Sequence, residues 1–354
     1  VDQKLGWGVV GTLEAMYSRT VNDMFYYQAN LQVPTARFSG ADNRYRYPTS
    51  RNINSNITDA TVLANAGSSY NYFFTAQLDK NFSNNLFVRL AYNYGVAKDL
   101  ISAGSIAYSS WSQNLSVNGN NYPDLSLSNN DLRHRLIAVV SYKLNWGSFA
   151  STQFNVFGEG RVQNNYSFNY AGDYNLDGVS GNDLIYVPTD ANDVNQIKFK
   201  DILKSDGTVQ FTVDQQKAAW TKFVDQNDYL KSRKGNYFER NGGLLPWVYN
   251  FDVSVVQEFH FNLGGKRNTF QIRGDIFNFG NLLNNKWGVG KTINTFSPLR
   301  VALDKAGKAL AVDPDNIQAV QMTPVNGTLD YSTYRSRATL GDVWQAQLGV
   351  RYIF

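Results

Sequence analysis

Alternating acidic and amide residues in the middle of the chain have the spacing of a calcium-binding loop. Asp173, Asn175 and Asp177 are separated by single residues, and Gly178 follows directly. In loops of this type, alternate side-chain oxygens converge on a hard cation, and the glycine permits the sharp turn. The spacing therefore makes Ca²⁺, in the loop spanning 172–245, the one cofactor that the sequence suggests.

The second half of the calcium pattern is incomplete. A bidentate glutamate is expected at the twelfth position, where this chain has Leu184, and Asn182 or Asp183 could substitute for it. The alternative is a solvated turn in which Asp, Asn and Gly serve only as good turn formers. The candidate ligands are Asp173, Asn175, Asp177 and Asp183.

Catalytic patterns are poorly represented. The only histidines are His134 and His260, and the chain has no cysteine. No Ser-His-Asp spacing or Gly-x-Ser-x-Gly turn accompanies them. We therefore expect no enzymatic activity, and the net charge of +4 is too small to indicate a nucleic-acid partner.

The composition favours an all-β membrane protein. Aromatic residues make up 14% of the 354 residues and charged residues only 18%. The mean hydropathy is −0.38, and no apolar run is long enough for a transmembrane helix. A transmembrane barrel fits these values, because only every second residue of a strand faces lipid.

The C-terminal residues 343–354 show a two-residue period. Apolar and aromatic side chains alternate with mostly polar or small ones, as in a strand that has two different faces. Aromatics at both ends of the apolar face are typical of the closing strand of an outer-membrane barrel. The residues that define this strand are Trp344, Gln347, Gly349, Arg351, Tyr352 and Phe354.

The same period recurs along the chain and predicts about nine antiparallel strands. Their connections alternate between short turns and long polar loops, as expected for short periplasmic turns and long extracellular loops. The longest loop has a helical pattern near 214–230. The predicted strands are 5–18, 24–33, 69–82, 86–98, 132–146, 150–170, 247–262, 268–288 and 343–354.

An odd number of strands is unexpected, because bacterial single-chain barrels close with an even number. We therefore expect residues 1–354 to be the C-terminal part of a larger barrel.

Residues 275–288, with the pattern D-I-F-N-x-x-N-L-L-N-x-x-W-G, resemble the penultimate strand of TonB-dependent outer-membrane receptors of the Bacteroidetes type. Residues 344–354 resemble the closing strand of that family. Residues 173–188 resemble a loop of its Oar-like subgroup, which carries a carboxypeptidase-regulatory-like domain and is related to SusC-like proteins. The residues that match the penultimate motif are Asp275, Asn278, Asn281, Leu282, Leu283, Asn284, Trp287 and Gly288.

The resemblance implies a barrel of roughly 22 strands that is closed by an N-terminal plug, and no plug is recognisable within 1–354. It implies TonB-dependent transport of an unidentified large substrate across the bacterial outer membrane, with TonB acting on the plug. The expected partners are outer-membrane lipid, the TonB complex, and a surface lipoprotein or another protein at the loops. The alternative is a structural or adhesive barrel whose loops bind a partner protein.

Overall fold

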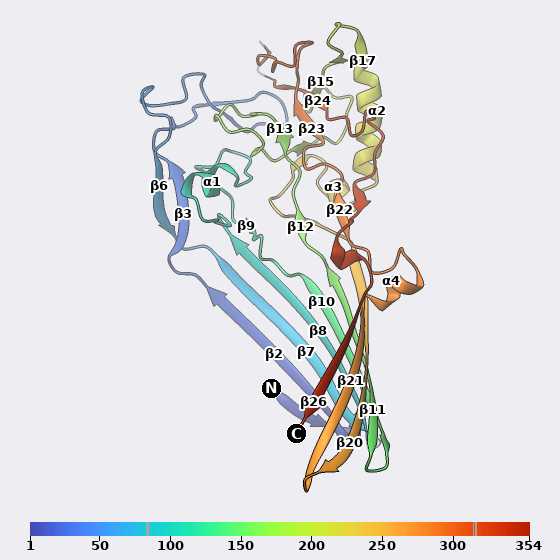
Figure 1. Ribbon diagram of the computed structural model, residues 1–354. Helices are drawn as coiled ribbons and strands as arrows, with labels where there is room; N and C mark the ends of the chain where they lie inside the picture. Colours follow the sequence, from blue (N-terminus) through green and yellow to red (C-terminus); the bar gives the residue numbers. More distant parts are fainter. Residues whose placement is uncertain (83–84, 314, 316) are drawn as a thin grey trace.

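The chain forms one long antiparallel sheet that carries a domain of folded loops at one end. The computed structural model describes residues 1–354 except 83–84, 314 and 316. Both termini lie near the end of the sheet that is opposite the loops (Figure 1). Within the described residues, no helix is both long and apolar enough to cross a bilayer.

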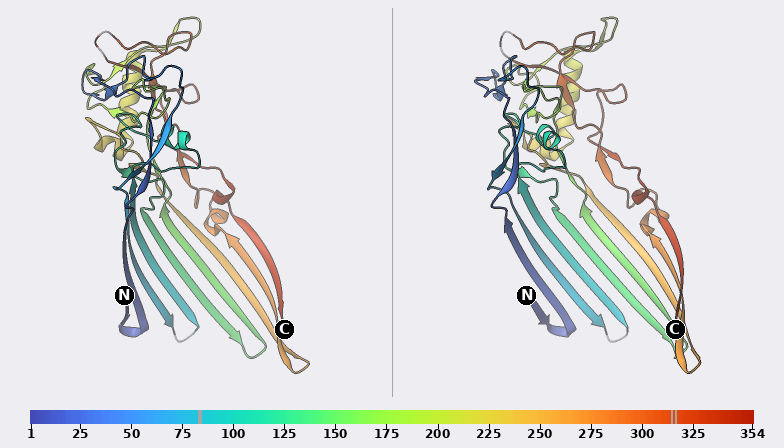
Figure 2. Two further views of the ribbon diagram at one scale, coloured as in Figure 1. Left: turned by 90° about the vertical axis from the view of Figure 1, so that its left-hand side faces the viewer. Right: turned by 60° about the vertical axis from the view of Figure 1, so that its left-hand side comes forward.

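Neighbouring strands of the sheet follow one another in the sequence and are antiparallel, from β1 to β26. Figure 2 shows the strands side by side and strongly tilted, as in the wall of a barrel. The predicted all-β barrel architecture is confirmed. The strands, in spatial order, are β1 (Asp2–Leu5), β2 (Val9–Arg19), β7 (Tyr70–Phe82), β8 (Leu86–Asp99), β10 (His134–Trp146), β11 (Ala150–Val162), β20 (Trp247–Leu263), β21 (Lys266–Phe277) and β26 (Gln345–Ile353).

The strand register sorts the side chains into an apolar face and a polar face. Leu13, Phe74 and Leu348 are 67%, 53% and 76% exposed, as expected for side chains that meet lipid rather than a protein core. One continuous apolar row across the strands is Val88, Val140, Val156, Val253, Ile276 and Ala346. One continuous polar row is Ser141, Asn155, Ser254, Asp275 and Gln347.

Short and long connections alternate strictly, as predicted. The short ones include Gly147–Phe149 and Gly264–Gly265, and the predicted turn at 83–85 falls largely outside the described residues. The long connections are 20–69, 100–133, 163–246 and 278–344, and together they form what we call the loop domain.

The predicted strand 5–18 is wrong at its start. The 3-10 helix η1 (Gly6–Gly8) reverses the chain, so that β1 pairs with β2 through Leu5 and Val9. Trp7 and Gly8 adopt φ values of 59° and 74°, and these left-handed conformations tighten the turn. The turn is not evident from the sequence, because Trp7 continues the alternation of large and small residues that predicts a strand.

The predicted barrel strand 24–33 lies outside the sheet. Residues 23–28 form β3 (Asp23–Gln28), which pairs with β6 (Thr61–Ala66) in a two-stranded ribbon. The segment between β2 and β3 does not reverse the chain, because β2 pairs with β7 whereas β3 pairs with β6. The ribbon continues β2 and β7 beyond the sheet, where Thr20 N donates to Ser69 O at 3.0 Å.

Two further strands are shorter than predicted. The predicted strand 150–170 leaves the sheet after Val162, because Tyr166 and Phe168 are buried in the loop domain. The predicted strand 268–288 ends at Phe277, because Asn278 takes a left-handed conformation and α4 (Phe279–Leu283) follows. In both cases the alternating pattern continues past the point where tertiary contacts redirect the chain.

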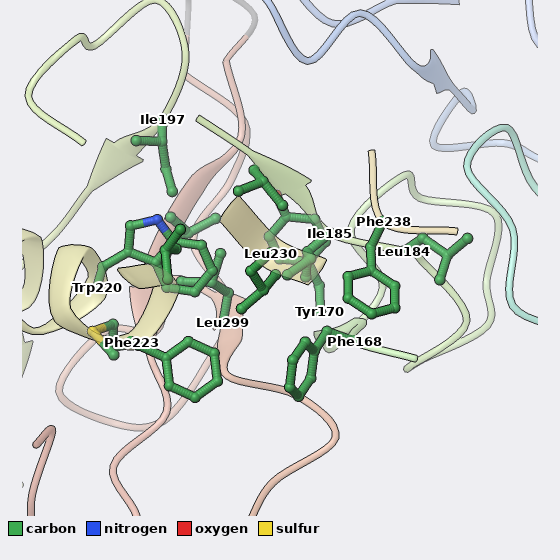
Figure 3. Close-up of a cluster of buried hydrophobic side chains, with 14 of the residues drawn as sticks. Phe168, Tyr170, Leu184, Ile185, Ile197, Trp220, Phe223, Leu230, Phe238 and Leu299 are labelled. Carbon is green, nitrogen blue, oxygen red and sulfur yellow. The ribbon is translucent and has the colours of Figure 1, made fainter. Parts of the chain in front are cut away.

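One hydrophobic core joins all four long connections, and Figure 3 shows the part of it that the third and fourth connections contribute. Phe38 and Val117 come from the first two, Phe168 and Trp220 from the third, and Leu299 from the fourth. Phe168 is completely buried, and its ring centroid lies 5.5 Å from that of Phe223 and 5.3 Å from that of Phe238. Burial of this size explains why segments with little regular structure are folded.

The loop domain contains short strands and helices around this core. The predicted helix near 214–230 is confirmed as α2 (Val213–Asp225) and α3 (Asp228–Ser232), and Thr212 and Gln215 form a capping box at the start of α2. The remaining elements are β4 (Ala36–Arg37), β5 (Tyr45–Arg46), α1 (Ala107–Ser112), β9 (Ser126–Leu127), β12 (Asn165–Tyr166), β13 (Tyr170–Ala171), β14 (Tyr186–Val187), β15 (Lys198–Phe199), β16 (Ile202–Leu203), β17 (Val209–Phe211), β18 (Asn236–Tyr237), β19 (Gly243–Leu244), β22 (Lys291–Ile293), β23 (Leu299–Val301), β24 (Ala319–Met322), β25 (Tyr334–Ser336) and the 3-10 helix η2 (Leu340–Asp342).

Substituting Phe168→Ala should destabilise the loop domain by about 3–5 kcal/mol, because it leaves a cavity where the four connections meet. Limited proteolysis of the protein in detergent should then cut 163–246 at lower protease concentration. Val194→Ala is the control, since Val194 is 56% exposed. Equal protease resistance of the two variants would contradict a shared core.

Candidate functional site

The base of the loop domain contains a polar hollow of about 780 Å³. It lies where the second long connection leaves β8, between β3, α1 and the segment that holds Arg240. Amide and hydroxyl side chains dominate its wall, so it can offer many hydrogen bonds to an uncharged ligand. Its polar lining residues include Ser102, Ser105, Ser109, Gln113, Asn114, Asn129, Asn130 and Asn241.

Arg240 and Asn241 connect the segments that form the wall of this hollow. Arg240 is 4% exposed and its Nη2 donates to Asp99 Oδ1 at 2.6 Å, so the one buried charge of the wall is neutralised. Asn241 Nδ2 donates to Leu127 O at 2.9 Å and to Asn129 Oδ1 at 2.8 Å. These bonds join the third long connection to the second.

A second hollow of about 440 Å³ adjoins the first and shares Gln113, Leu115, Asn129 and Asn241 with it. Tyr166 and Phe296 contribute aromatic surface to its wall. Amides beside aromatic rings suit a ligand with polar groups and apolar faces, such as a peptide or an oligosaccharide. Sequence reasoning missed these residues, because Asn and Ser in loops form no periodic pattern.

The predicted calcium ligands lie together in one compact turn at 173–183. Gly178 N donates to Asp173 Oδ2 at 2.8 Å, and Val179 N donates to Asp177 Oδ1 at 2.8 Å. Asp183 closes the turn, since its Oδ2 accepts from Tyr174 N at 2.9 Å. Asn175, Asp177 and Asp183 are each at most 2% exposed.

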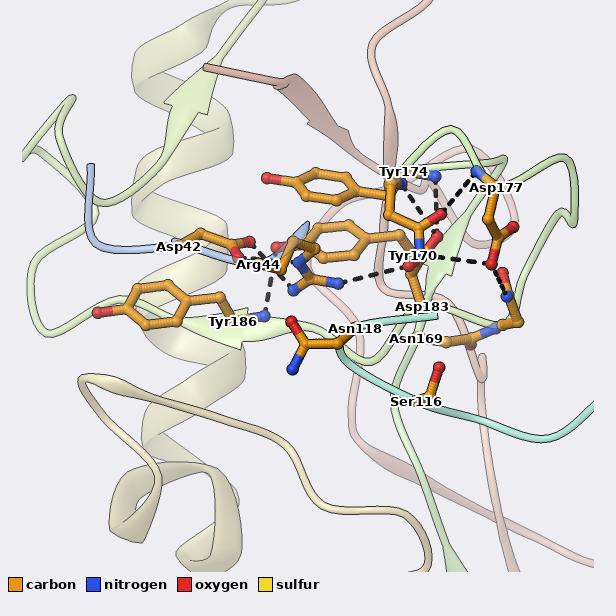
Figure 4. A network of polar contacts seen from close by, with 12 residues as sticks. Asp42, Arg44, Ser116, Asn118, Asn169, Tyr170, Tyr174, Asp177, Asp183 and Tyr186 are labelled. Atoms are coloured by element: carbon orange, nitrogen blue, oxygen red, sulfur yellow. Dashed lines mark hydrogen bonds and ion pairs between the residues drawn. The ribbon is translucent and has the colours of Figure 1, made fainter. Parts of the chain in front are cut away.

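A buried arginine from the first long connection reaches this turn (Figure 4). Arg44 is completely buried and contacts Asp42 with two nitrogens, at 2.8 and 3.0 Å. Its Nη1 lies 3.7 Å from Asp183 Oδ1, and its guanidinium lies 4.7 Å from the ring centroid of Tyr174. Sequence reasoning missed Arg44, which is far from the turn along the chain.

Burial raises the pKa values of the three aspartates in the turn, and neighbouring carboxylates add to the shift of Asp177 and Asp183. Burial, followed by repulsion from Asp173, raises the pKa of Asp177 to about 6. Burial and the Asp177 carboxylate raise the pKa of Asp183 well above its ordinary value, although Arg44 opposes that shift. Burial also raises the pKa of Asp173. Negative charge is thus unfavourable here without a further cation.

Within the described part of the chain, no three His, Cys, Asp or Glu side chains are placed to hold a metal ion. Any cation in the turn would therefore need amide oxygens as well as carboxylates. Calcium in this loop stays a prediction.

The predicted penultimate motif forms a tight clamp at the loop end of the sheet. Asn278 N donates to Asp252 Oδ1 of β20 at 2.8 Å, and Asn278 Nδ2 donates to Gly288 O at 3.2 Å. Asn281 Nδ2 donates to Trp287 O at 3.0 Å, and Asn281 Oδ1 accepts from the N–H of Trp344 at 3.2 Å. The motif therefore connects β20, β21 and β26.

The other motif residues shape the same clamp. Asn284 Oδ1 accepts from Lys286 N at 3.0 Å. Gly288 has a φ of +64°, and a Cβ there would collide with the Asn278 side chain. Leu282, Leu283 and Trp287 are 41%, 64% and 56% exposed. Such exposed apolar groups at the rim suit the interface between lipid and water.

The closing strand has the predicted faces. Leu348 and Tyr352 lie opposite Gly274 and Phe270 of β21, and Gln347 lies opposite Asp275. Gly349 and Arg351 lie opposite Arg273 and Gln271 on the polar face, and Tyr352 Oη donates to Asn268 Oδ1 at 2.6 Å. Phe354 is 89% exposed at the end of the chain.

Charges on the polar face of the sheet pair with one another. The closest pairs are Asp79 with Arg89 at 2.7 Å, Arg135 with Glu159 at 2.7 Å, and Arg273 with Asp275 at 2.8 Å. Arg89 and Arg273 nevertheless keep side chains that are 42% and 55% exposed. These six side chains therefore neutralise one another in pairs, and the two arginines remain accessible.

Asp342 secures the start of the closing strand. Its carboxylate accepts hydrogen bonds from Gly290 N at 2.9 Å, Arg337 Nε at 3.0 Å and Thr339 N at 3.0 Å. Burial alone would raise the pKa of Asp342, but these bonds hold it well below its ordinary value.

Comparison with known proteins finds a match to one protein family. The sequence profile described as "Outer membrane beta barrel domain" matches residues 1–295. No curated protein and no solved structure matches the chain.

Substituting Asp342→Asn should destabilise the protein by about 1–3 kcal/mol near neutral pH, because charge-assisted bonds to a buried carboxylate are lost. The folded pKa lies below the unfolded value, so this stabilisation is full above about pH 4 and is lost as the pH falls further. Urea unfolding in lipid vesicles at several pH values measures both effects.

Asp330→Asn is the control, since the Asp330 side chain is 75% exposed. A wild-type advantage over Asp342→Asn that stays constant down to about pH 2 would refute the assigned role of the ionised carboxylate.

Proposed function

The chain belongs to the outer membrane beta barrel domain family, and on that premise we propose that it is the C-terminal barrel part of a TonB-dependent transporter. It is a multi-strand barrel protein of the bacterial outer membrane, with its apolar face against lipid. In the proposal, the loop domain captures substrate outside the cell. TonB acts on a plug from another part of the polypeptide and opens a path along the polar face.

The observation that carries this proposal is the pair of adjoining polar hollows in a folded loop domain above a polar sheet face. Loops that served only to join strands would not need a common core or a wall of convergent amides. A hollow of about 780 Å³ is within the size range of small-molecule sites and suits one segment of a larger ligand.

The chemistry of the hollows supports an uncharged substrate in this proposal. Arg240 is paired with Asp99, and Asp23 is the one further charged side chain of the walls, so amides and hydroxyls make up most of their polar groups. Asn and Ser side chains instead favour uncharged donors and acceptors, as in peptide backbones and sugar hydroxyls. The proposal assigns no catalysis to the chain.

The resemblance of 275–288 and 344–354 to TonB-dependent receptors of the Bacteroidetes type supports the energised mechanism. The accessible, self-paired charges of the polar face are compatible with either water or a plug in the lumen. A surface lipoprotein or another protein over the loop domain would complete the capture site in this proposal.

Cells that express the native gene should take up a fluorescent peptide or oligosaccharide pool in two stages. Surface binding should persist when a protonophore collapses the proton-motive force, whereas label protected from an external quencher should fall several-fold. Gln113→Trp, which inserts an indole between the two hollows, should abolish both signals. Val194→Trp, at an exposed position outside the hollow linings, should retain them.

Protected label that is indifferent to the protonophore would contradict energised transport. Surface binding without any protected label would instead support the adhesive barrel. Full binding by Gln113→Trp would show that the hollows are not the substrate-binding site.

A further inference from the structure

The turn at 173–183 contains buried oxygens that lack hydrogen-bond donors. Asn182 is 1% exposed, yet its Oδ1 accepts no hydrogen bond. Asp183 is completely buried, and its Oδ1 has only the contact with Arg44 at 3.7 Å. Asp173 Oδ1 is also buried without a donor. Unsatisfied acceptors of this kind are rare in folded proteins, and a bound ion is one partner that satisfies them. Arg44 Nη1, which faces Asp183 Oδ1, is likewise buried without a hydrogen-bond partner.

Two amide groups occupy the position where a cation would contact Asp177. Asn182 Nδ2 donates to Asp177 Oδ2 at 2.9 Å, and Asn175 Nδ2 approaches the same oxygen at 3.4 Å. The amino groups thus supply the partial positive charge that the carboxylate requires. Rotating the Asn182 amide by half a turn exchanges its amino group for its unpaired oxygen, and the two orientations have almost the same shape. Asn175 Oδ1 already accepts from Asp177 N at 2.9 Å, so the Asn175 amide keeps its orientation and offers the second lone pair of that oxygen.

We propose that this turn binds one calcium ion through Asp173, Asn175, Asp177, Asn182 and Asp183. The donors are all oxygens, and carboxylates and amides suit a hard cation. The turn supplies no histidine or cysteine, which disfavours zinc and copper. In the present conformation the three carboxylates are not gathered around one point, so binding requires rotation of the Asn182 amide and a closing movement of the turn.

The site lies where three long connections meet. Tyr47 N donates to Asn175 O at 2.9 Å, and Ser116 N donates to Asn182 O at 2.9 Å. Leu176 and Val179 of the turn pack in a small core with Trp111 and Tyr47. A cation that fixes the turn would therefore hold 20–69 and 100–133 against 163–246.

This role differs from substrate capture and does not depend on energised uptake. It makes external calcium a condition for an ordered loop domain. A dissociation constant on the order of 10⁻⁴–10⁻³ M, as in other extracellular calcium modules, would keep the site filled on a cell surface.

The test uses the full chain in detergent after chelation. Tb³⁺, a calcium mimic, should give luminescence sensitised by nearby aromatic rings, and Ca²⁺ should displace it. Ca²⁺ should also protect the loop domain from protease, whereas equimolar Mg²⁺ should not. Asp177→Asn keeps the side-chain shape, and it should weaken Tb³⁺ and Ca²⁺ binding by about tenfold or more because it removes ligand charge.

Asp190→Asn makes the same charge change at an exposed position of the same connection and should bind as the wild type does. In chelator, Asp177→Asn should resist protease at least as well as the wild type, because it relieves carboxylate repulsion. This comparison separates lost binding from misfolding. The proposal fails if the wild type gives no sensitised luminescence, if Mg²⁺ protects equally, or if Asp177→Asn binds as the wild type does.

Discussion

The lipid bilayer offers no hydrogen bonds, so every backbone N–H and C=O that crosses it must be bonded within the protein. The antiparallel ladder from β2 to β26 meets this constraint between its neighbouring strands, whereas the outer edges of β1 and β26 have no strand partner among the described residues. Its two-residue period places Phe74 and Leu348 against lipid and Asp79 and Arg89 on the polar face. Its alternating direction collects every long connection at one end of the sheet.

Collection at one end allows the long connections to fold together. Each contributes side chains to one core, and buried ion pairs then fix their relative positions. Arg44 joins the first connection to the third through Asp183, and Arg240 joins the third to the end of β8 through Asp99. The polar hollows and the acidic turn both lie at such junctions, so the candidate sites depend on tertiary folding of the loops.

The local sequence pattern predicted those features that depend on residues close together in the chain. Alternation located β7, β8, β10 and β20 almost to the residue, and single-residue spacing located the acidic turn at 173–183. Prediction failed where distant contacts decide the path of the chain. Residues 24–28 pair with β6, and Phe168 turns into a core assembled from four connections. Arg44 and Arg240 carry no sequence signal for the contacts that join segments, because Asp183 and Asp99 lie far from them along the chain.

The topology can be tested most directly with single cysteines, since residues 1–354 contain none. Asp190→Cys lies on the loop domain and Ser148→Cys on a short turn, and both positions are exposed. A membrane-impermeant maleimide should label Asp190→Cys on intact cells, and Ser148→Cys only after the outer membrane is permeabilised. Labelling of Ser148→Cys on intact cells would contradict a membrane-spanning sheet with its loop domain outside.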